Sequence, residues 1–364
     1  MRLRQPSRLP EVGVGPWSSL RIVHVNDIAS VASVLAEAQS RLGASVRVLD
    51  PPKPLAHLPY PWKVLSFPLR VVPLVAVVMD LRRDRAALVH IHYATQGVVG
   101  LGVGRRFVIH CHGSDIRGAR PGSLRGAVLS TILRRAALVL YATPDLAADV
   151  GRFRRDAAYL PNPIDTAAFA PSRTPTRDVL MATKLDPVKG AGTAVEALAR
   201  LLERRPATRI TVIASGPMLD AVRSRLGHRA RFIPPVEHAR MPDLIRDHRV
   251  ALGQFRLGIL SQVELESLAC GVPVVTWFDH PEAYEDQPPI VIAHEPGEIA
   301  TRLAGLLDDE PGRAGLATAG RSWVIANHDS DRIAGRLDEA YRSAGLLSGR
   351  EPLSPSGAMG EGRR

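Results

Sequence analysis

Short apolar runs alternate with longer amphipathic stretches along almost the whole chain. Continuous apolar runs are typical of strands buried on both faces, and their alternation with helical patterns predicts βαβ units and mainly parallel sheets. The first half of the chain has six predicted strands, at residues 21–24, 45–49, 88–92, 107–110, 138–141 and 158–160. The second half has six more, at residues 179–182, 209–214, 231–233, 250–253, 273–277 and 290–292.

The stretches between the strands predict helices. Apolar positions at helical spacing favour helices at residues 29–42, 124–135, 192–203 and 264–269, and a last amphipathic helix at 331–345. A segment with four prolines, residues 161–178, joins the two runs of strands. We therefore expect an α/β protein of two doubly wound, Rossmann-like domains. They would face each other across a cleft that holds a ligand at the carboxyl ends of the strands.

The domain boundaries follow from the same pattern. We expect an N-terminal domain over residues 19–170, a C-terminal domain over 176–328, and a helix over 329–346 that packs back toward the N-terminal domain. The tails, 1–18 and 347–364, are rich in Gly, Pro, Arg and Ser and are expected to be disordered.

The most apolar run, residues 64–79, contains Arg70 and two prolines and is shorter than the ~20 residues that span a bilayer. We expect a buried helix of the first domain, with a segment lying in a membrane interface as the alternative.

Positive charge is concentrated in the first half. The 364 residues carry 47 Lys and Arg against 36 Asp and Glu, a net charge of +11, and residues 1–165 account for all of this excess. Coding bias toward Arg explains the abundance of Arg but not this asymmetry, which favours an anionic partner for the first domain. Two cysteines exclude a disulfide framework and a Cys-based zinc site and fit a reducing cytosol. The start lacks the apolar core of a secretory signal.

The segment after strand 179–182 carries the clearest candidate chemistry. Lys184 and Lys189 stand in one loop, and the glycine-rich turn 190–192 then opens a helix. Two cations beside the free amides and dipole of a helix N-terminus make a clamp for a diphosphate. Two exposed loop lysines are the alternative, although half of the chain's four lysines fall here.

Two further turns of the second domain are candidates for ligand contact. Gly216 would let the backbone approach a ligand closely. The amides of Gln262 and Val263, at a helix start, suit phosphate oxygens. Glu266 is a candidate to bind a vicinal diol such as a ribose, whereas Glu264 is expected on a solvated helix face.

Histidines end two neighbouring strands of the first domain. His90 and His92 close one strand and His110 and His112 follow on the next, and residues two apart share a face of the sheet. Four histidines could bind a metal, but no carboxylate completes a familiar ligand pattern, so we expect packing or hydrogen bonding and no metal. His112 begins a polar turn with Asp115 and is the best candidate to face the cleft.

Five segments in chain order carry recognisable motifs: CHGSDIRG (111–118), YLPNPID (159–165), ATKLDPVKG (182–190), SGP (215–217) and VELESLACGVPVV (263–275). They resemble, in the same order, the HG-x-D turn, the P-N-G-V-D connector, the G-R-L…K-G loop, the G-x-G-P turn and the L-x-E-A-M-A-C-G-x-P-V-V segment of the retaining GT-B glycosyltransferases, specifically glycosyltransferase family 4. The resemblance covers most of residues 20–345 and implies the GT-B architecture, in which the C-terminal domain binds a nucleotide sugar.

The resemblance also implies roles for the donor-binding residues. Lys189 would bind the donor diphosphate, and Lys184 would replace the family's arginine. Glu266 would bind the ribose, and the amides of Gln262 and Val263 would bind the phosphate.

On the other side of the cleft, the resemblance implies that His112, the candidate catalytic residue, contacts the sugar near the reacting carbon. Asp115, Asn162 and Gly258 are secondary cleft positions. Gly258 is a departure, because it stands where the family has the first of two glutamates, which normally holds the sugar. No metal or other cofactor is implied, because cations and helix dipoles stabilise the leaving nucleoside diphosphate.

The sequence therefore predicts a cytoplasmic enzyme that moves a hexose from a nucleoside diphosphate sugar to a lipid-linked, anionic or cell-envelope glycan acceptor. Its basic N-terminal domain would contact an anionic membrane surface, with a peripheral location on the inner face of the cell membrane. The alternative is a catalytically altered GT-B protein that binds a nucleotide or a partner without turnover. An oxidoreductase is disfavoured because no GxGxxG follows the first strand, and a nucleic-acid binder because no reading module is present.

Overall fold

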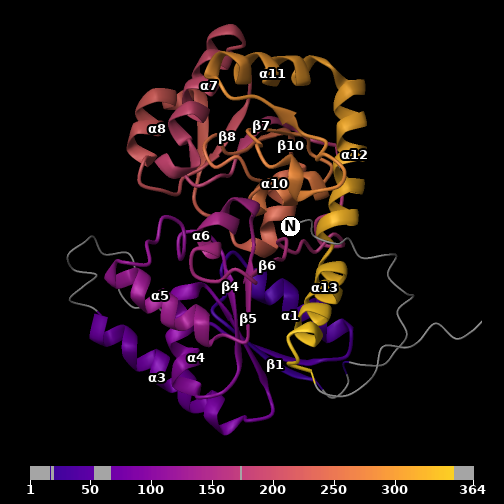
Figure 1. The fold of residues 1–364 in the computed structure, drawn as a ribbon. Coiled ribbons are helices and arrows are strands. Elements are labelled where there is room, and N and C mark those ends of the chain that lie inside the picture. Colours follow the sequence, from indigo (N-terminus) through magenta and orange to yellow (C-terminus); the bar gives the residue numbers. More distant parts are fainter. Residues whose placement is uncertain (1–16, 18–19, 53–66, 173, 348–364) are drawn as a thin grey trace, which may run out of the picture.

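The computed structural model describes residues 17, 20–52, 67–172 and 174–347, and it consists of two lobes, each built on a six-stranded parallel sheet (Figure 1). The sheet of the first lobe has the order β2-β1-β3-β4-β5-β6, with β1 (Arg21–Val25), β2 (Ser45–Leu49), β3 (Leu88–His92), β4 (Phe107–Cys111), β5 (Leu138–Tyr141) and β6 (Ala158–Tyr159). The sheet of the second lobe has the order β12-β11-β10-β7-β8-β9, with β7 (Arg177–Met181), β8 (Ile210–Ile213), β9 (Ala230–Ile233), β10 (His248–Leu252), β11 (Val274–Thr276) and β12 (Val291–Ile292).

Helices connect the strands of each lobe. The first lobe has α1 (Val31–Arg41), α3 (Phe67–Arg83), α4 (Val98–Val103), α5 (Leu124–Arg135) and α6 (Ala147–Gly151). The second has α7 (Ala191–Arg204), α8 (Leu219–Leu226), α9 (Met241–Arg246), α10 (Gln262–Ala269) and α11 (Pro296–Asp308). Two long helices follow, α12 (Glu310–His328) and α13 (Ser330–Ser343). The predicted strands and helices are confirmed with ends within two residues, and so is the α/β class with two doubly wound sheets.

Burial on both faces explains why the central strands are almost wholly apolar. Every residue of β3 and β4 is buried. Successive side chains point to opposite faces, so that Val89 and Ile91 join the core beneath α3, α4 and α5, whereas Leu88 joins the core beneath α1 and α13. The histidines of these strands alternate with the first set and therefore lie on the α1 and α13 face.

Helix α3 differs from the buried helix expected for residues 64–79. One side packs on the core through Leu74, Val77 and Val78, but Val72 and Met79 on the other side are exposed. The helix covers one face of the sheet, and among the described residues no further layer covers its outer side, so apolar side chains on that side are exposed. Within the described residues, no helix is long and apolar enough to cross a membrane.

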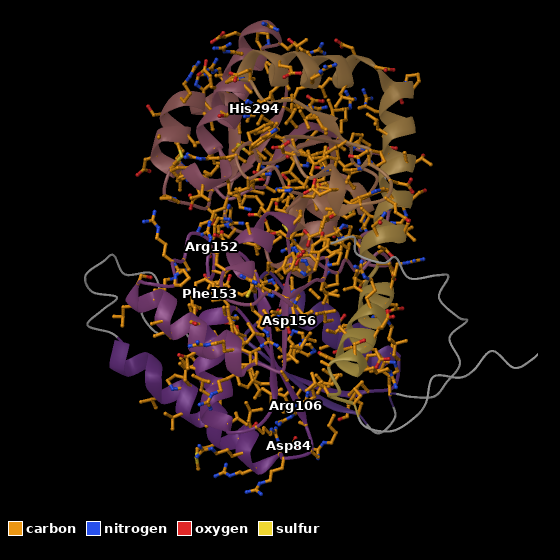
Figure 2. All side chains as sticks on the ribbon, in the orientation of Figure 1. Asp84, Arg106, Arg152, Phe153, Asp156 and His294 are labelled. Atoms are coloured by element: carbon orange, nitrogen blue, oxygen red, sulfur yellow. The ribbon has the colours of Figure 1, made fainter. Side chains whose placement is uncertain are left out.

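The two lobes are joined by two segments that lie side by side. The Ile164 amide donates to the His328 carbonyl at 2.7 Å, and the Ser330 amide donates to the Ile164 carbonyl at 2.9 Å. Helix α12 descends from the second lobe, and α13 packs against α1 of the first (Figure 1). Arg106, labelled in Figure 2, binds the backbone carbonyls at the end of α13. The tails predicted to be disordered fall almost entirely outside the described residues.

Candidate functional site

The lysine-bearing loop of the second lobe is fixed by its own backbone. After β7 the chain makes a 3₁₀ turn, Pro187–Lys189, closed by the Asp186 side chain. Gly190 then adopts a left-handed conformation (φ +74°), and a Cβ there would lie 2.9 Å from the carbonyl carbon of Phe255. The Lys189 carbonyl accepts a hydrogen bond from the Phe255 amide at 3.0 Å. The loop is thus packed against the segment that follows β10.

The two lysines of this loop have different environments. Lys189 is half-buried, and burial lowers the pKa of its ammonium group, with Glu264 and Arg117 acting on it in opposite directions. Lys184 is exposed. Arg117 forms an ion pair with Asp145, and both belong to the first lobe, within electrostatic range of Lys189. The structure therefore places Lys189 at the boundary between the lobes and Lys184 on the surface.

Gly216 packs on the same loop. Its φ is +134°, and a Cβ there would lie 2.3 Å from the carbonyl oxygen of Leu185. The Leu185 amide in turn donates to the Ser215 carbonyl at 2.8 Å. The close approach that Gly216 allows in this structure is to protein backbone, and it sets the position of the lysine loop.

The start of α10 leaves two amides without an acceptor. The Ser261 side chain and the Glu264 side chain form a capping box, in which Glu264 accepts from the Ser261 amide at 2.5 Å. The amides of Gln262 and Val263 form no hydrogen bond with any described residue. These two groups, together with the positive end of the helix dipole, are available to an anion.

Glu264 is not on a solvated face, so that expectation was wrong. Its side chain is buried, and it also accepts hydrogen bonds from the Gln254 amide at 2.6 Å and the Thr276 hydroxyl at 3.1 Å. It ties the loop after β10 to α10 and to β11. The Ser-x-x-Glu spacing of the capping box, from Ser261, is a sequence signal for part of this role.

Glu266 is buried and pairs closely with His238, a residue that the sequence did not indicate, and the Gln262 side chain also acts on its carboxylate. The Nε2 atom of His238 lies 2.7 Å from Oε1 of Glu266. Burial raises the pKa of Glu266, and hydrogen bonding to Glu266 raises the pKa of His238. His238 also lies within electrostatic range of Asp27 and Glu37 in the first lobe. Glu266 thus lies near the cleft, with its carboxylate held by an imidazole.

Gly258 lies in the loop that Glu264 holds. Its φ is +65°, and a Cβ there would lie 3.0 Å from Cβ of Asp279. The Gly258 carbonyl accepts from the Asp279 amide at 3.0 Å. The exposed Asp279 therefore stands directly beside the position that lacks a side chain.

On the first lobe, His112 follows β4 and leads into a turn that Asp115 organises. The buried carboxylate of Asp115 accepts from the amides of Ala94 at 2.6 Å, Gly113 at 2.7 Å and His112 at 3.1 Å. Asp115 therefore holds the turn by binding its backbone amides and does not face the cleft. Arg117, in the same turn, provides the charge that approaches Lys189, and the sequence analysis did not single it out.

Asn162 lies where the two inter-lobe segments cross. Its carbonyl accepts from Nδ1 of His328 at 2.8 Å, while the other ring nitrogen lies 3.0 Å from the Tyr284 hydroxyl. The next carbonyl, of Pro163, accepts from the Gln262 side chain at 3.3 Å. Asn162 thus connects the crossing to the start of α10.

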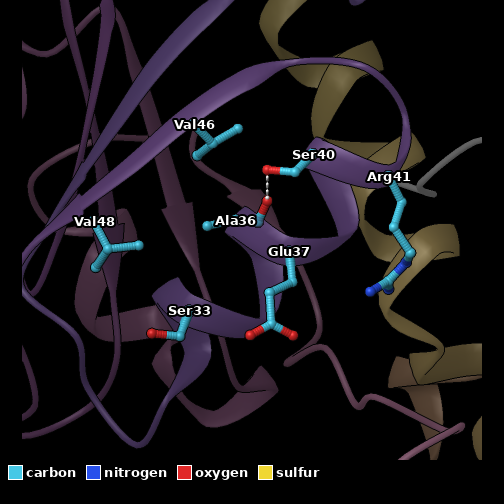
Figure 3. Close-up of a pocket in the computed structure, with 7 residues that line it drawn as sticks. All are labelled: Ser33, Ala36, Glu37, Ser40, Arg41, Val46 and Val48. Atoms are coloured by element: carbon cyan, nitrogen blue, oxygen red, sulfur yellow. Dashed lines mark hydrogen bonds between the residues drawn. The ribbon is translucent and has the colours of Figure 1, made fainter.

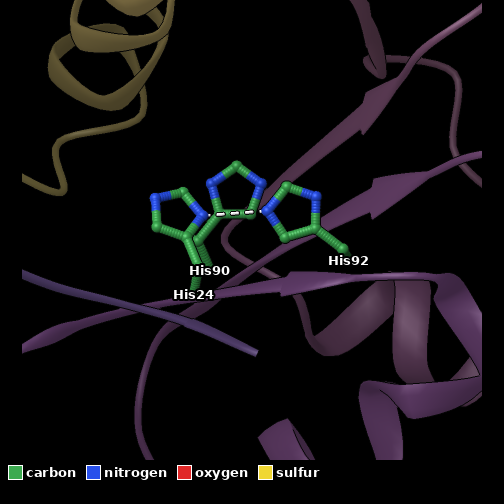
Figure 4. A group of neighbouring side chains, drawn as sticks. All are labelled: His24, His90 and His92. Carbon is green, nitrogen blue, oxygen red and sulfur yellow. Dashed lines mark hydrogen bonds between the residues drawn. The ribbon is translucent and has the colours of Figure 1, made fainter. Parts of the chain in front are cut away.

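The histidines of the first lobe form one cluster. His24 of β1 joins the expected set, and its Nδ1 lies 2.8 Å from Nε2 of His92 (Figure 4). Nδ1 of His92 lies 3.0 Å from Nε2 of His112, His90 stacks on His92, and the His110 ring lies tilted against that of His112. The prediction that these strand-end histidines share a face is confirmed.

A separate pocket of about 590 Å³ lies on the first lobe between α1 and β2 (Figure 3). Polar side chains of α1 and apolar side chains of β2 line it: Ser33, Ala36, Glu37, Ser40, Arg41, Val46 and Val48. Arg41 also binds Asp331 at the start of α13.

Family comparisons match both lobes. The sequence model described as "Glycosyltransferase Family 4" matches residues 28–168, and the one described as "Glycosyl transferase-like" matches residues 193–339. A GDP-mannose-dependent phosphatidylinositol monomannoside mannosyltransferase of Mycolicibacterium smegmatis is 32% identical over 53% of this chain and 56% of its own length. A D-inositol 3-phosphate glycosyltransferase of Acidothermus cellulolyticus is 30% identical over 46% of this chain and 41% of its own length. The matched region thus spans about half of the length of each of these relatives, or less.

Solved structures agree on the fold. HepE of Anabaena, crystallised with UDP and glucose, has a TM-score of 0.67 at 15% identity, covering 89% of this chain and 100% of that one. Sucrose-phosphate synthase of Thermosynechococcus elongatus has a TM-score of 0.69 at 16% identity, covering 90% and 100%. With the two family matches in chain order and the two-lobed architecture, the chain belongs to glycosyltransferase family 4 and has the GT-B fold.

Proposed function

We propose that the protein is a retaining glycosyltransferase that moves a hexose from a nucleoside diphosphate sugar to an acceptor held by the first lobe. The observation that carries the proposal is a set of anion-binding groups at the lobe boundary. Lys189 and the two free amides of α10 come from the second lobe, and Arg117 approaches from the first. Glu266, on the next turn of α10, supplies a carboxylate for the ribose hydroxyls.

The same groups account for the chemistry. As the bond between sugar and diphosphate breaks, negative charge grows on the leaving phosphate, and fixed cations and amides stabilise that charge. The leaving phosphate helps to deprotonate the acceptor hydroxyl, which attacks from the same face, so the configuration of the sugar is retained. We expect the reaction to need no metal, so that transfer persists in excess EDTA, which removes divalent ions.

We propose that the acceptor is a polyol or glycan on a lipid. The pocket between α1 and β2 offers serine hydroxyls, a carboxylate and a guanidinium over apolar side chains, which suits a sugar-like ring with a charged substituent. Relatives named for phosphatidylinositol mannoside and inositol phosphate acceptors support this class.

We further propose that the first lobe contacts an anionic membrane at its inner, cytoplasmic face. Seven exposed apolar side chains lie on α3, α4 and α5, and we call them the apolar patch: Val72, Val75, Met79, Val98, Leu101, Leu124 and Val128. Exposed arginines flank the apolar patch: Arg82, Arg83, Arg85, Arg125, Arg134 and Arg135. None of these six pairs with a carboxylate of the described residues. Exposed apolar side chains together with exposed guanidinium groups that have no carboxylate partner among the described residues fit a bilayer with anionic headgroups.

Calorimetry with GDP, UDP and ADP, followed by transfer assays with GDP-mannose and UDP-glucose, tests the donor. The acceptors are vesicles that contain phosphatidylinositol, and the product linkage is determined by NMR. We expect one nucleoside diphosphate to bind selectively and its sugar to be transferred with retention. Inversion, or the absence of nucleotide binding, would contradict the proposal.

Gly258 favours a second candidate, a GT-B protein that binds a nucleotide without turnover. The position that carries the sugar-holding glutamate in the family has no side chain here, and the atoms nearest to a Cβ at this position belong to Asp279. Tight nucleotide binding with no transfer from any donor would select this candidate. Loss of transfer in Asp279→Asn, with nucleotide affinity unchanged, would exclude it.

A further inference from the structure

Four side chains of the first lobe form a single hydrogen-bonded chain that ends at His112. The Gln39 side chain of α1 contacts His24 of β1, with 2.7 Å between Oε1 and Nε2. Nδ1 of His24 lies 2.8 Å from Nε2 of His92, and Nδ1 of His92 lies 3.0 Å from Nε2 of His112. Gln39, His24 and His92 are fully buried, and only His112 reaches solvent. Each of the two inner imidazoles therefore uses both of its ring nitrogens inside the protein.

A chain of this kind has a direction. A neutral imidazole has one N–H donor and one bare acceptor nitrogen, and an amide oxygen only accepts. Nε2 of His24 therefore donates to Gln39, which leaves Nδ1 of His24 as an acceptor for the Nε2–H of His92. Nδ1 of His92 then accepts from the Nε2–H of His112. The remaining nitrogen, Nδ1 of His112, is left bare and makes no hydrogen bond with a described residue.

The rings are neutral, as this direction requires. Burial lowers the pKa of His24 to about 4 and that of His112 to about 3, and it holds the pKa of His92 well below its usual value. The surroundings of His112 include His90, His92 and His110, and no carboxylate pairs with any of these rings.

The geometry favours hydrogen bonds over a metal site. Two nitrogens bound to one tetrahedral zinc ion at about 2.0–2.1 Å stand roughly 3.3 Å apart, farther than either pair in the chain. One ring nitrogen each of His24, His90 and His92 lies within 4.8 Å of the others (Figure 4), but His90 stacks on His92 with 14° between the ring planes, so one ion would not lie in the planes of both rings.

We propose that His92, held by His24 and Gln39, is a positioning residue that locks His112 in the tautomer with its proton on Nε2. The bare Nδ1 of His112 then accepts a hydrogen bond from a hydroxyl group of the donor sugar. The contact with the sugar rests on the proposed function, whereas the tautomer does not.

Histidine-selective ¹⁵N labelling with long-range ¹H–¹⁵N correlation spectra at pH 7 reads the tautomer without any substrate. We expect His112 to show a protonated Nε2 and a bare Nδ1. In His92→Phe we expect a mixture of the two tautomers and a roughly tenfold lower kcat, with KM for the donor little changed. His92→Gln keeps one acceptor and one donor and is expected to restore a single tautomer and most of the activity. His90→Phe, an equally buried control outside the chain, is expected to leave the tautomer of His112 as it is.

Three results would overturn the proposal. One is a wild-type His112 protonated on Nδ1, and another is an unchanged tautomer in His92→Phe. The third is one equivalent of tightly bound zinc, measured by mass spectrometry, that depends on His92. A protein that transfers no sugar but shows the expected tautomers would contradict the proposed function and leave the positioning role of His92 intact.

Discussion

At the residue scale, the position of Lys189 is energetically unusual. Its ammonium group is half-buried and has no carboxylate within salt-bridge distance among the described residues, while burial lowers its pKa. Keeping a partly buried ammonium group without a direct partner costs free energy. Binding of an anion beside it offsets this cost. In the proposed function, the diphosphate of a nucleotide sugar would be this anion.

We therefore expect Lys189→Ala to weaken the binding of the donor nucleoside diphosphate by about 1.5–3 kcal/mol, the range for a hydrogen bond to a charged group. Isothermal titration calorimetry measures the change. Lys184→Ala is the matched control, and because Lys184 is exposed we expect a loss of at most about 1 kcal/mol. Unchanged affinity of Lys189→Ala for the nucleoside diphosphate would remove Lys189 from the site.

The left-handed backbone at Gly258 makes it costly to introduce a side chain there, including the family's glutamate. A non-glycine residue in the left-handed region costs about 1–2 kcal/mol, and the new Cβ would also crowd Asp279. We expect Gly258→Glu and Gly258→Ala to lower the free energy of unfolding by similar amounts, measured by urea titration. Gly305→Ala, in the open interior of α11, is the control and is expected to be neutral or stabilising. A Gly258→Ala protein as stable as the wild type would contradict the strain.

Individual contacts were the least predictable part of the site. Lys189, Glu266 and the amides of α10 could be placed from the sequence because each belongs to a local strand–loop–helix pattern. The pairing of His238 with Glu266 could not, because it joins residues 28 apart through the fold. Glu264 was misplaced because an eight-residue helix buried on several sides has no polar face to read.

At the scale of elements, the sheet of the first lobe contains an unusual number of buried, neutral histidines. His24, His90, His92 and His110 line the face beneath α1 and α13, and burial lowers the pKa of each. The unfolded chain binds protons at these positions near pH 6.5, whereas the folded protein does not bind them until the pH is much lower. Stability is therefore complete above pH 6.5 and is lost as the pH falls.

We expect the free energy of unfolding to fall steeply between pH 6.5 and pH 4. The shift of His24 alone, from 6.5 to about 4, corresponds to about 3 kcal/mol. Urea titrations at several pH values measure the slope. Replacing His110, whose ring nitrogens both lack a hydrogen bond of good geometry, by Leu is expected to reduce it. His294→Gln, an exposed change, is expected to leave it alone. A pH-independent stability in this range would show that the cluster is charged or solvated.

The elements themselves were predictable because of how parallel sheets are buried. Runs such as Val89 to Ile91 are apolar on both faces, and the turns between runs contain Gly, Pro or Asp. The burial of each face of a helix was not predictable in the same way, as α3 shows. Its sequence is apolar all round, and only the absence of a covering layer leaves Val72 and Met79 exposed.

At the scale of the molecule, charge and apolar exposure coincide on one side of the first lobe. Helix α3 packs against α4, and α4 against α5, so the three helices that carry the apolar patch are neighbours (Figure 1). The excess positive charge of the chain lies in the same half. In the proposed membrane contact, apolar insertion and attraction to anionic headgroups would therefore act together on this lobe.

We expect the protein to sediment with phosphatidylglycerol vesicles and much less with phosphatidylcholine vesicles, and high salt should weaken the binding. Val75→Asp with Met79→Asp should lower the bound fraction by about tenfold, since each side chain then repels the bilayer. Ile325→Asp, on exposed α12 of the second lobe, is the matched control. Undiminished sedimentation of the double variant would discard the apolar patch as the contact surface.

The adjacent crossings at Ile164 and Ser330 have a mechanical consequence. The two segments that connect the lobes are hydrogen-bonded side by side. Such a pair acts as a hinge, because it permits rotation about the line of the two segments and resists sliding or twisting. Groups near this hinge, such as Asn162, then move little when the lobes separate. Groups at the opposite edge move farthest, so under the proposed membrane contact the second lobe would be the one that swings outward and exchanges a nucleotide.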